Sequence, residues 1–254
     1  MHSCFIPFIV EPPASLIPEQ LNNPFDINTP ELCKQAAAQL QNFIIKHQPA
    51  WLHNFGLDET KQGVAKGKMF GVLVVKSKEG KLGYLCTFSG KMADEPHPPV
   101  FVPSLFDITT NNNFISKGMR ELSALGYAVK ALEEESRIDN LQKIKKLKEE
   151  RKLKSILLQQ QLFESYNFLN TRGELKNVCA VFETNSGKVP PSGAGECAAP
   201  KLLHYAFKHH LKPLAIAEFW CGKDSGDKKH GQYYPPCTDK CGPILGYMLE
   251  LPLS

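Results

Sequence analysis

Three cysteines at the starts of two predicted helices constrain the fold of this chain more than any other feature. Cys197 begins one helix-forming segment, ECAAPKLLHYAFKHH, and Cys237 and Cys241 begin another, CTDKCGPILGYML. Between them lies an apolar run at 214–222, LAIAEFWCG, which has the composition of a buried strand. A connection of the parallel type through such a strand would place both helix starts side by side. We therefore expect the three thiols to meet at one point.

The site formed by Cys197, Cys237 and Cys241 is predicted to hold a zinc ion. Unpaired backbone NH groups at helix N-termini favour thiolates, and zinc takes thiolate ligands in fours, or in threes with one open position. The alternative is that these are reduced cysteines buried in helix–sheet packing. Both interpretations suit a reducing compartment, because the chain has eight cysteines and its first residues do not resemble a signal peptide. We expect a cytoplasmic protein.

A zinc site that carries out hydrolysis also needs a carboxylate to move protons. The sequence offers two candidates, Glu196 directly before the first cysteine and Glu218 on the predicted strand. His204 lies on the same predicted helix as Cys197 and is expected to be a structural histidine rather than a fourth ligand.

The remaining periodicity predicts an α/β fold, with a central mixed sheet flanked by helices. The segment 30–52 has apolar residues at helical spacing, and 69–88 contains two apolar runs around a polar turn, which indicates a β-hairpin. A short strand is expected at 178–183, VCAVFE, and helices at 196–210 and 237–249.

Residues 114–170 lack proline and are rich in helix formers. We expect a helical, coiled-coil-like insertion with a break near Gly126 or at Asp139-Asn140, because a single helix of this length does not fit a compact domain. An apolar seam along it would allow the chain to act as a dimerisation scaffold. The predicted organisation is an N-terminal arm and helix at 1–65, an α/β core at 66–113 and 171–254, and the insertion at 114–170.

The middle of this insertion carries a basic run, KIKKLKEERKLK, in a chain whose formal net charge is +4. Such a run can contact RNA phosphates, although a solvated face of salt bridges is the common alternative. No run in the chain has the length of a membrane span. The candidate RNA-binding residues are Lys143, Lys145, Lys146, Lys148, Arg151, Lys152 and Lys154.

Several blocks of this sequence resemble the long N-terminal extension of some bacterial pseudouridine synthases of the ribosomal large-subunit type. The blocks are GKMFGVLVV with GYLCTFSG, QLFESYNFLNTRGELKNVC, VPPSGAGECAAPKLLHYAFKHHLKPLAIAEFWCG and YYPPCTDKCGPIL. In that group a charged helical arm of variable length also precedes the Gly-Glu-Cys block. The resemblance implies a role in RNA modification, as an RNA-binding accessory domain beside a pseudouridine synthase catalytic domain, with ribosomal or transfer RNA as the partner.

The nucleophilic aspartate of those synthases lies in an Arg-Leu-Asp motif, which is absent from these 254 residues. The chain is therefore not expected to isomerise uridine alone, and whether it is an enzyme stays open.

The cysteine layout is also similar to that of the zinc-dependent deaminases of nucleosides and nucleic acids, whose ligands are one His or Cys and a later Pro-Cys-x-x-Cys. Pro236-Cys237 fits that motif, but Cys241 is one residue further along, and Ala199 stands where the family has its proton-carrying Glu. This resemblance implies the second possible function, a zinc-dependent deaminase-like hydrolase that acts on a base or nucleoside.

Overall fold

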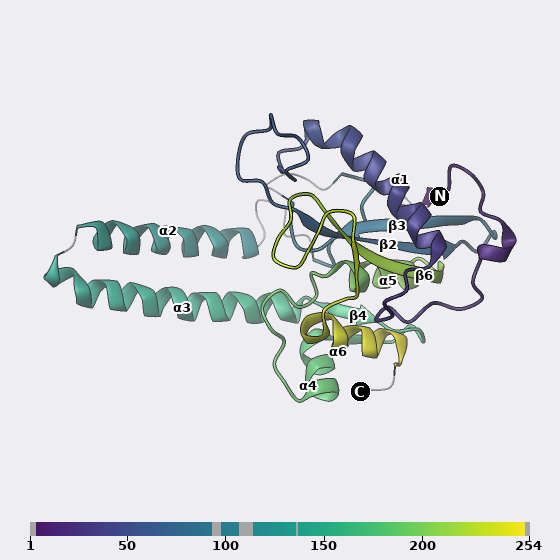
Figure 1. Cartoon of the computed structure of the whole chain (residues 1–254). Coiled ribbons are helices and arrows are strands. Elements are labelled where there is room, and N and C mark those ends of the chain that lie inside the picture. The colour runs from purple at the N-terminus through teal and green to yellow at the C-terminus, as the bar shows by residue number, and fades with distance from the viewer. Residues whose placement is uncertain (1–3, 93–97, 107–113, 136, 252–254) are drawn as a thin grey trace. The chain divides into compact units, whose positions relative to one another are not determined.

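The computed structural model describes residues 4–92, 98–106, 114–135 and 137–251. The chain forms two compact units (Figure 1), which are described separately. The core unit comprises Met1–Leu105 and Asn167–Ser254, and the helical unit comprises Phe106–Tyr166.

The core unit contains a five-stranded sheet in which every neighbouring pair of strands is antiparallel. The prediction of a central mixed sheet is therefore wrong, because neighbouring strands of this sheet do not run parallel to one another. The predicted hairpin is confirmed as β2 and β3, and β6 pairs with the other edge of β2. Because β3 and β6 both run antiparallel to β2, they share one direction. In order across the sheet, the strands are β1 (Ile6–Pro7), β3 (Leu82–Phe88), β2 (Lys68–Lys76), β6 (Lys212–Cys221) and β7 (Tyr233–Tyr234).

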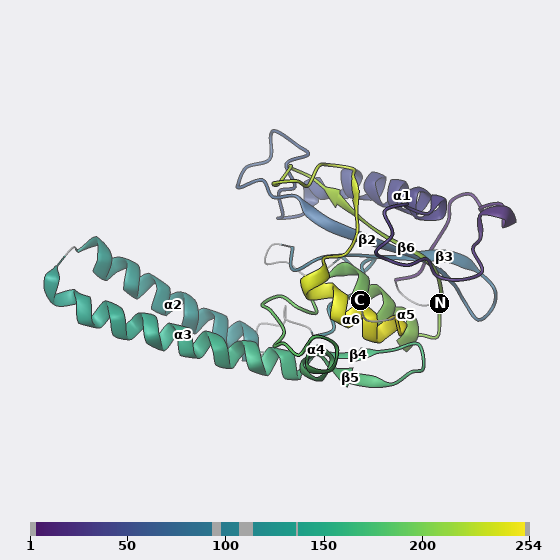
Figure 2. The ribbon, with the colours of Figure 1, turned by 60° about the horizontal axis from the view of Figure 1, so that its bottom comes forward.

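Helices cover both faces of this sheet (Figure 2). One face is covered by α1 (Glu31–His47), which buries Leu32, Ala36, Leu40 and Ile44 at helical spacing. The other face carries α5 (Ala198–Lys208) and α6 (Thr238–Leu249). Short 3₁₀ turns occur at Ala14–Leu16 and Gln48–Ala50. β2 and β3 are apolar along nearly their whole length, because helices cover both faces of the sheet. This pattern is usual in parallel sheets and occurs here in an antiparallel one.

The prediction of a strand at 178–183 is wrong, because this segment lies in helix α4 (Val178–Ser186). The side chain of Asn177 accepts a hydrogen bond from the backbone NH of Cys179, which caps the helix start. Gly187, with φ of 62°, ends it in the left-handed conformation. A two-stranded sheet of β4 (Asn167–Leu169) and β5 (Leu175–Asn177) precedes α4. The apolar run alone did not distinguish helix from strand, and the caps decide it.

The helical unit is a pair of helices, α2 (Phe114–Glu134) and α3 (Leu141–Glu164), with a 3₁₀ turn at Ile138–Asn140 before α3. Of the two breaks expected, the one at Asp139-Asn140 is present, whereas Gly126 lies inside α2. The helical segment is shorter than expected at its C-terminal end, since strand β4 follows α3. Along α2 the buried side chains recur every seven residues, at Ile115, Leu122 and Val129.

Gly71 on β2 lies directly beneath the start of α5. A Cβ atom there would lie 2.9 Å from the Cβ of Ala198 and 3.0 Å from Cδ1 of Leu202. Gly71→Val is therefore expected to destabilise the protein by about 2 kcal/mol, because overpacking moves the helix away from the sheet. Urea unfolding measures this change. The control is Gly242→Ala, where the added Cβ meets nothing within 4 Å, and a similar loss in both variants would contradict the packing argument.

Candidate metal centre

Three sulfur atoms converge at the N-termini of α5 and α6. Cys197 is the N-cap residue of α5, Cys237 is the N-cap residue of α6, and Cys241 lies in the first turns of α6. Their Sγ atoms all lie within 4.8 Å of one another. The Sγ atoms of Cys237 and Cys241 are 3.5 Å apart, which is far longer than a disulfide bond of about 2.05 Å. The predicted convergence of the three thiols is therefore present, as free cysteines.

The spacing and chemistry of these donors suit a single metal ion. Zinc–thiolate bonds of about 2.3 Å in a tetrahedral site imply sulfur–sulfur separations slightly below about 4 Å. The cluster is close to this geometry, with one pair of sulfurs 3.5 Å apart and all three within 4.8 Å of one another. Cys241 is buried, Cys197 is half-buried and Cys237 is exposed. One side of the cluster thus remains open to solvent, and an ion has an entry path.

The three thiols titrate as a set. Hydrogen bonds from the thiols of Cys197 and Cys241 lower the pKa of Cys237 to about 2, and the backbone NH groups of Lys240 and Cys241 add to this effect. Hydrogen bonding to Cys237 raises the pKa of Cys197, against the hydrogen bond with Cys241, and hydrogen bonding to both other cysteines raises the pKa of Cys241. One thiolate is therefore stabilised by two thiols, and a bound cation is what would allow all three sulfurs to lose their protons.

The cysteine at the N-cap of α5 makes no capping hydrogen bond, so the first NH groups of this helix bond to other residues. The Ala198 NH donates to Oγ of Ser89 at 3.2 Å. The Ala199 NH donates to Oε1 of Glu218 at 2.9 Å. The thiol of Cys197 is thus left to face the other two cysteines.

Glu218 brings a buried carboxyl group to the start of the helix that carries Cys197. It lies on β6 and is 5% exposed. Burial raises its pKa to about 7, and the negative charge of Cys237 acts in the same direction. The sequence comparison with the deaminases leaves position 199 without a carboxylate, because the residue there is Ala. The structure supplies one from the neighbouring strand, hydrogen-bonded to the backbone of that same position.

Lys201 is a buried lysine one turn after Cys197, and the sequence reasoning missed it. Its side chain is 1% exposed and its ammonium group donates a hydrogen bond to the carbonyl of Phe88. Burial lowers its pKa to about 8, against the opposing charges of Glu196, Cys197 and Glu218. Its spacing of four residues from Cys197 on a helix was the available signal. A buried cation beside the thiols helps to balance their negative charge.

Among the described residues, the other predicted site residues do not join the sulfur cluster. Burial raises the pKa of Glu196, and the charges that act on it belong to Lys201 and Lys91 rather than to the cysteines. His204 accepts a hydrogen bond from the backbone NH of Leu169 at its Nδ1, and burial lowers its pKa to about 4. His204 is therefore a structural histidine, as expected, and is not part of the sulfur cluster.

The basic run lies on α3 of the helical unit. Among the described residues, two of its seven cations form ion pairs, Lys148 with Glu133 at 2.8 Å and Lys154 with Glu121 at 3.1 Å. Apolar side chains are also exposed on this helix, including Leu153, Ile156 and Leu157. The expectations of RNA contact and of dimerisation through the arm both remain predictions. The other five basic residues are exposed, and they are Lys143, Lys145, Lys146, Arg151 and Lys152.

Comparison with protein-family models, with curated proteins and with solved structures finds no match to this chain. In the described part of the chain, no helix combines the length and the apolar character that crossing a membrane requires.

Proposed function

We propose that this chain is a zinc-binding domain that serves as an RNA-binding accessory domain beside a pseudouridine synthase catalytic domain. The observation that carries the zinc part of the proposal is the convergence of the Cys197, Cys237 and Cys241 sulfurs at two helix starts. The soft thiolate donors favour zinc among the common divalent metals of proteins. When bound, the ion would hold the N-termini of α5 and α6 together. The resemblance to the synthase extensions supplies the RNA context.

The RNA part of the proposal is supported by the charge of α3. This helix carries seven basic residues and three acidic ones, and five of the basic side chains are exposed outside the two ion pairs given above. Binding through phosphates does not require aromatic residues in the basic run, and it would position an RNA without reading its bases.

Neutralising the five exposed cations of α3, by substitution of each with glutamine, is expected to weaken RNA binding by about a hundredfold at moderate salt. Each lost phosphate contact also reduces the dependence of the affinity on salt concentration. A gel-shift titration at several salt concentrations measures both effects. The control variant replaces Lys148 and Lys154, which already pair with carboxylates, and should lose much less affinity. A wild-type chain that binds no RNA would contradict the proposed function.

A deaminase-like hydrolase is the second candidate, and the position of Glu218 favours it. A carboxyl group at the start of the helix that carries Cys197 could hold and transfer a proton, which hydrolysis of an amino group on a base requires. The parallel β3 and β6 strands on either side of β2, with α5 between them in the chain, support a deaminase-like core. Zinc would supply Lewis acidity when bound. Release of ammonia from nucleosides or RNA tests this candidate, and activity that survives both Cys237→Ser and Glu218→Gln would exclude it.

A further inference from the structure

Within the core unit, an open hollow of about 680 Å³ lies between two turns. One turn is the β4–β5 connection, residues 170–174, and the other is the α5–β6 connection, residues 209–211, together with the ends of the elements that flank it. Four basic side chains line the hollow, and the acidic residues next to it, Glu174 and Glu250, pair with one of them, Arg172. We refer to this site as the basic hollow, and its basic residues are Arg172, Lys208, His210 and Lys212.

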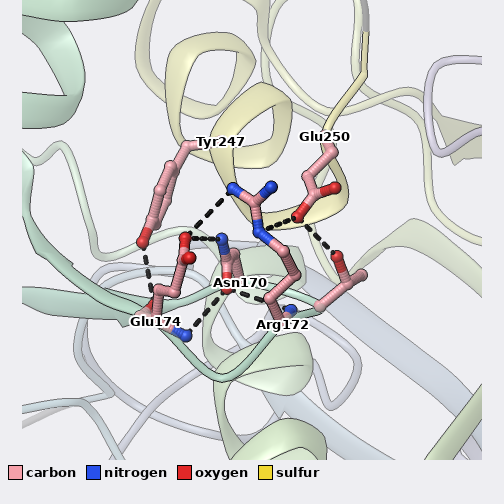
Figure 3. Close-up of polar contacts among 6 residues, drawn as sticks. Asn170, Arg172, Glu174, Tyr247 and Glu250 are labelled. Atoms are coloured by element: carbon pink, nitrogen blue, oxygen red, sulfur yellow. Dashed lines mark hydrogen bonds and ion pairs between the residues drawn. The ribbon is translucent and has the colours of Figure 1, made fainter.

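A polar network fixes the β4–β5 turn (Figure 3). Asn170 is buried, and its Oδ1 accepts hydrogen bonds from the backbone NH groups of Arg172 and Glu174. The guanidinium of Arg172 contacts Glu174 at 3.0 Å and Glu250 at 3.1 Å. The hydroxyl of Tyr247 donates to the carbonyl of Glu174, which ties the turn to α6. The Arg172 side chain is therefore held in one orientation before any ligand arrives.

Backbone geometry distinguishes the basic hollow and its immediate neighbours from the rest of the described chain. Only two described residues other than glycine have positive φ, His210 and Glu250, each at 54°. Both lie at or beside the hollow, because His210 lines it and Glu250 forms an ion pair with Arg172, which also lines it. A left-handed conformation is unfavourable for an L-residue, and glycine is the usual residue there. A side chain kept in such a conformation points to a use for that side chain.

The left-handed conformation of His210 belongs to a helix-end motif. The NH of His210 bonds to the carbonyl of Phe207, and the NH of Leu211 bonds to the carbonyl of Ala206. These two bonds form a Schellman motif, in which His210 occupies the position that glycine commonly takes. Packing of the helix end therefore does not require the imidazole, which instead contributes to the lining of the hollow.

We infer that the basic hollow binds phosphate groups of an RNA backbone, as a second contact surface separate from α3. The inference rests on the proposed RNA-binding function and places part of it on the core unit. Lys208, the last residue of α5, and Lys212, the first residue of β6, are exposed cations, and ammonium groups suit phosphate oxygens. Because Arg172 already pairs with Glu174 and Glu250, the two lysines supply the positive charge that a phosphate would meet. An acidic protein segment is the other ligand with matching charge, and it becomes the remaining candidate if charge reversal at the hollow leaves RNA binding no weaker than in the control pair.

The test compares two charge reversals of equal size. Lys208→Glu with Lys212→Glu is expected to weaken binding of a single-stranded RNA of mixed sequence by about tenfold and to lower its salt dependence. The control pair is Lys46→Glu with Lys78→Glu, two exposed lysines of the core unit outside the hollow, and it should lose clearly less. Equal losses in the two pairs, with the wild type binding RNA, would overturn the inference and leave the proposed function standing. A wild type that binds no RNA overturns both.

His210→Gly provides an independent readout that a merely structural role would not produce. The variant is expected to keep or raise the thermal midpoint, because glycine adopts the left-handed conformation without strain, while RNA affinity falls about threefold. A less stable variant would show that the imidazole stabilises the fold. A variant that binds RNA as tightly as the wild type would show that the imidazole does not contribute to RNA binding at the hollow. Either result contradicts the inference.

Discussion

Cys241→Ser is expected to lower the thermal midpoint of the zinc-loaded protein by about 10 °C. A ligand present at a thousand times its Kd stabilises the native state by about 4 kcal/mol, and each kcal/mol corresponds to about 2–4 °C for a domain of this size. Cys241 is buried and lies within the sulfur cluster, so its loss leaves two ligands and removes most of the affinity. Differential scanning calorimetry with and without a chelator measures the effect.

The control for this experiment is Cys179→Ser, because Cys179 is a half-buried cysteine on α4 outside the cluster. Its midpoint should still fall when the chelator is added, as in the wild type. The Cys241→Ser protein should show no further change with chelator. A wild-type midpoint that does not respond to chelation would mean that no metal stabilises the fold.

Glu218→Gln is expected to stabilise the metal-free protein at pH 8 by about 3 kcal/mol. The pKa of Glu218 is raised from 4.5 to about 7 by burial, so between these values the folded state holds a proton that the unfolded state has lost. Stability contributed at this position therefore falls as the pH rises from about 4.5 to 7 and is constant above that range. A shift of this size corresponds to about 3 kcal/mol, and glutamine avoids it because it carries no charge.

Denaturant unfolding at pH 4 and pH 8, with a chelator present, measures this difference. At pH 4 the variant and the wild type should have nearly equal stability, since the carboxyl group is protonated in both states. Glutamine also keeps an oxygen that can accept from the Ala199 NH. The exposed Glu183→Gln serves as the control and should change stability at neither pH. A Glu218→Gln protein that is less stable at pH 8 would show that an ion pair, for example with Lys201, stabilises the charged form.

Much of the secondary structure of the core unit could be predicted from patterns of apolar and turn residues within short segments. The apolar runs around Gly80 gave the hairpin, and the helical periodicity of Leu32, Ala36 and Leu40 gave α1. The strand predicted at 178–183 failed because the apolar run was given more weight than Asn177 and Gly187, which are typical helix start and stop residues on either side of it.

The convergence of the three cysteines was predicted from the sequence, and Glu218 was named as a candidate carboxylate, but the contacts around the cluster were not predicted. Three cysteines at helix starts have a sequence signature, so their convergence could be expected. The hydrogen bond between Glu218 and Ala199 joins residues 19 positions apart, and it depends on which strand β6 pairs with. The burial of Lys201 and the left-handed conformation of His210 likewise follow from tertiary packing, and no local pattern predicts them.

Elemental analysis of the purified chain tests the central claim most directly. The three-sulfur site predicts one zinc ion per chain in the wild type, and loss of that ion in a variant with serine at positions 197, 237 and 241. Zinc well below one per chain in the wild type, or an equal zinc content in the triple variant, would contradict the account.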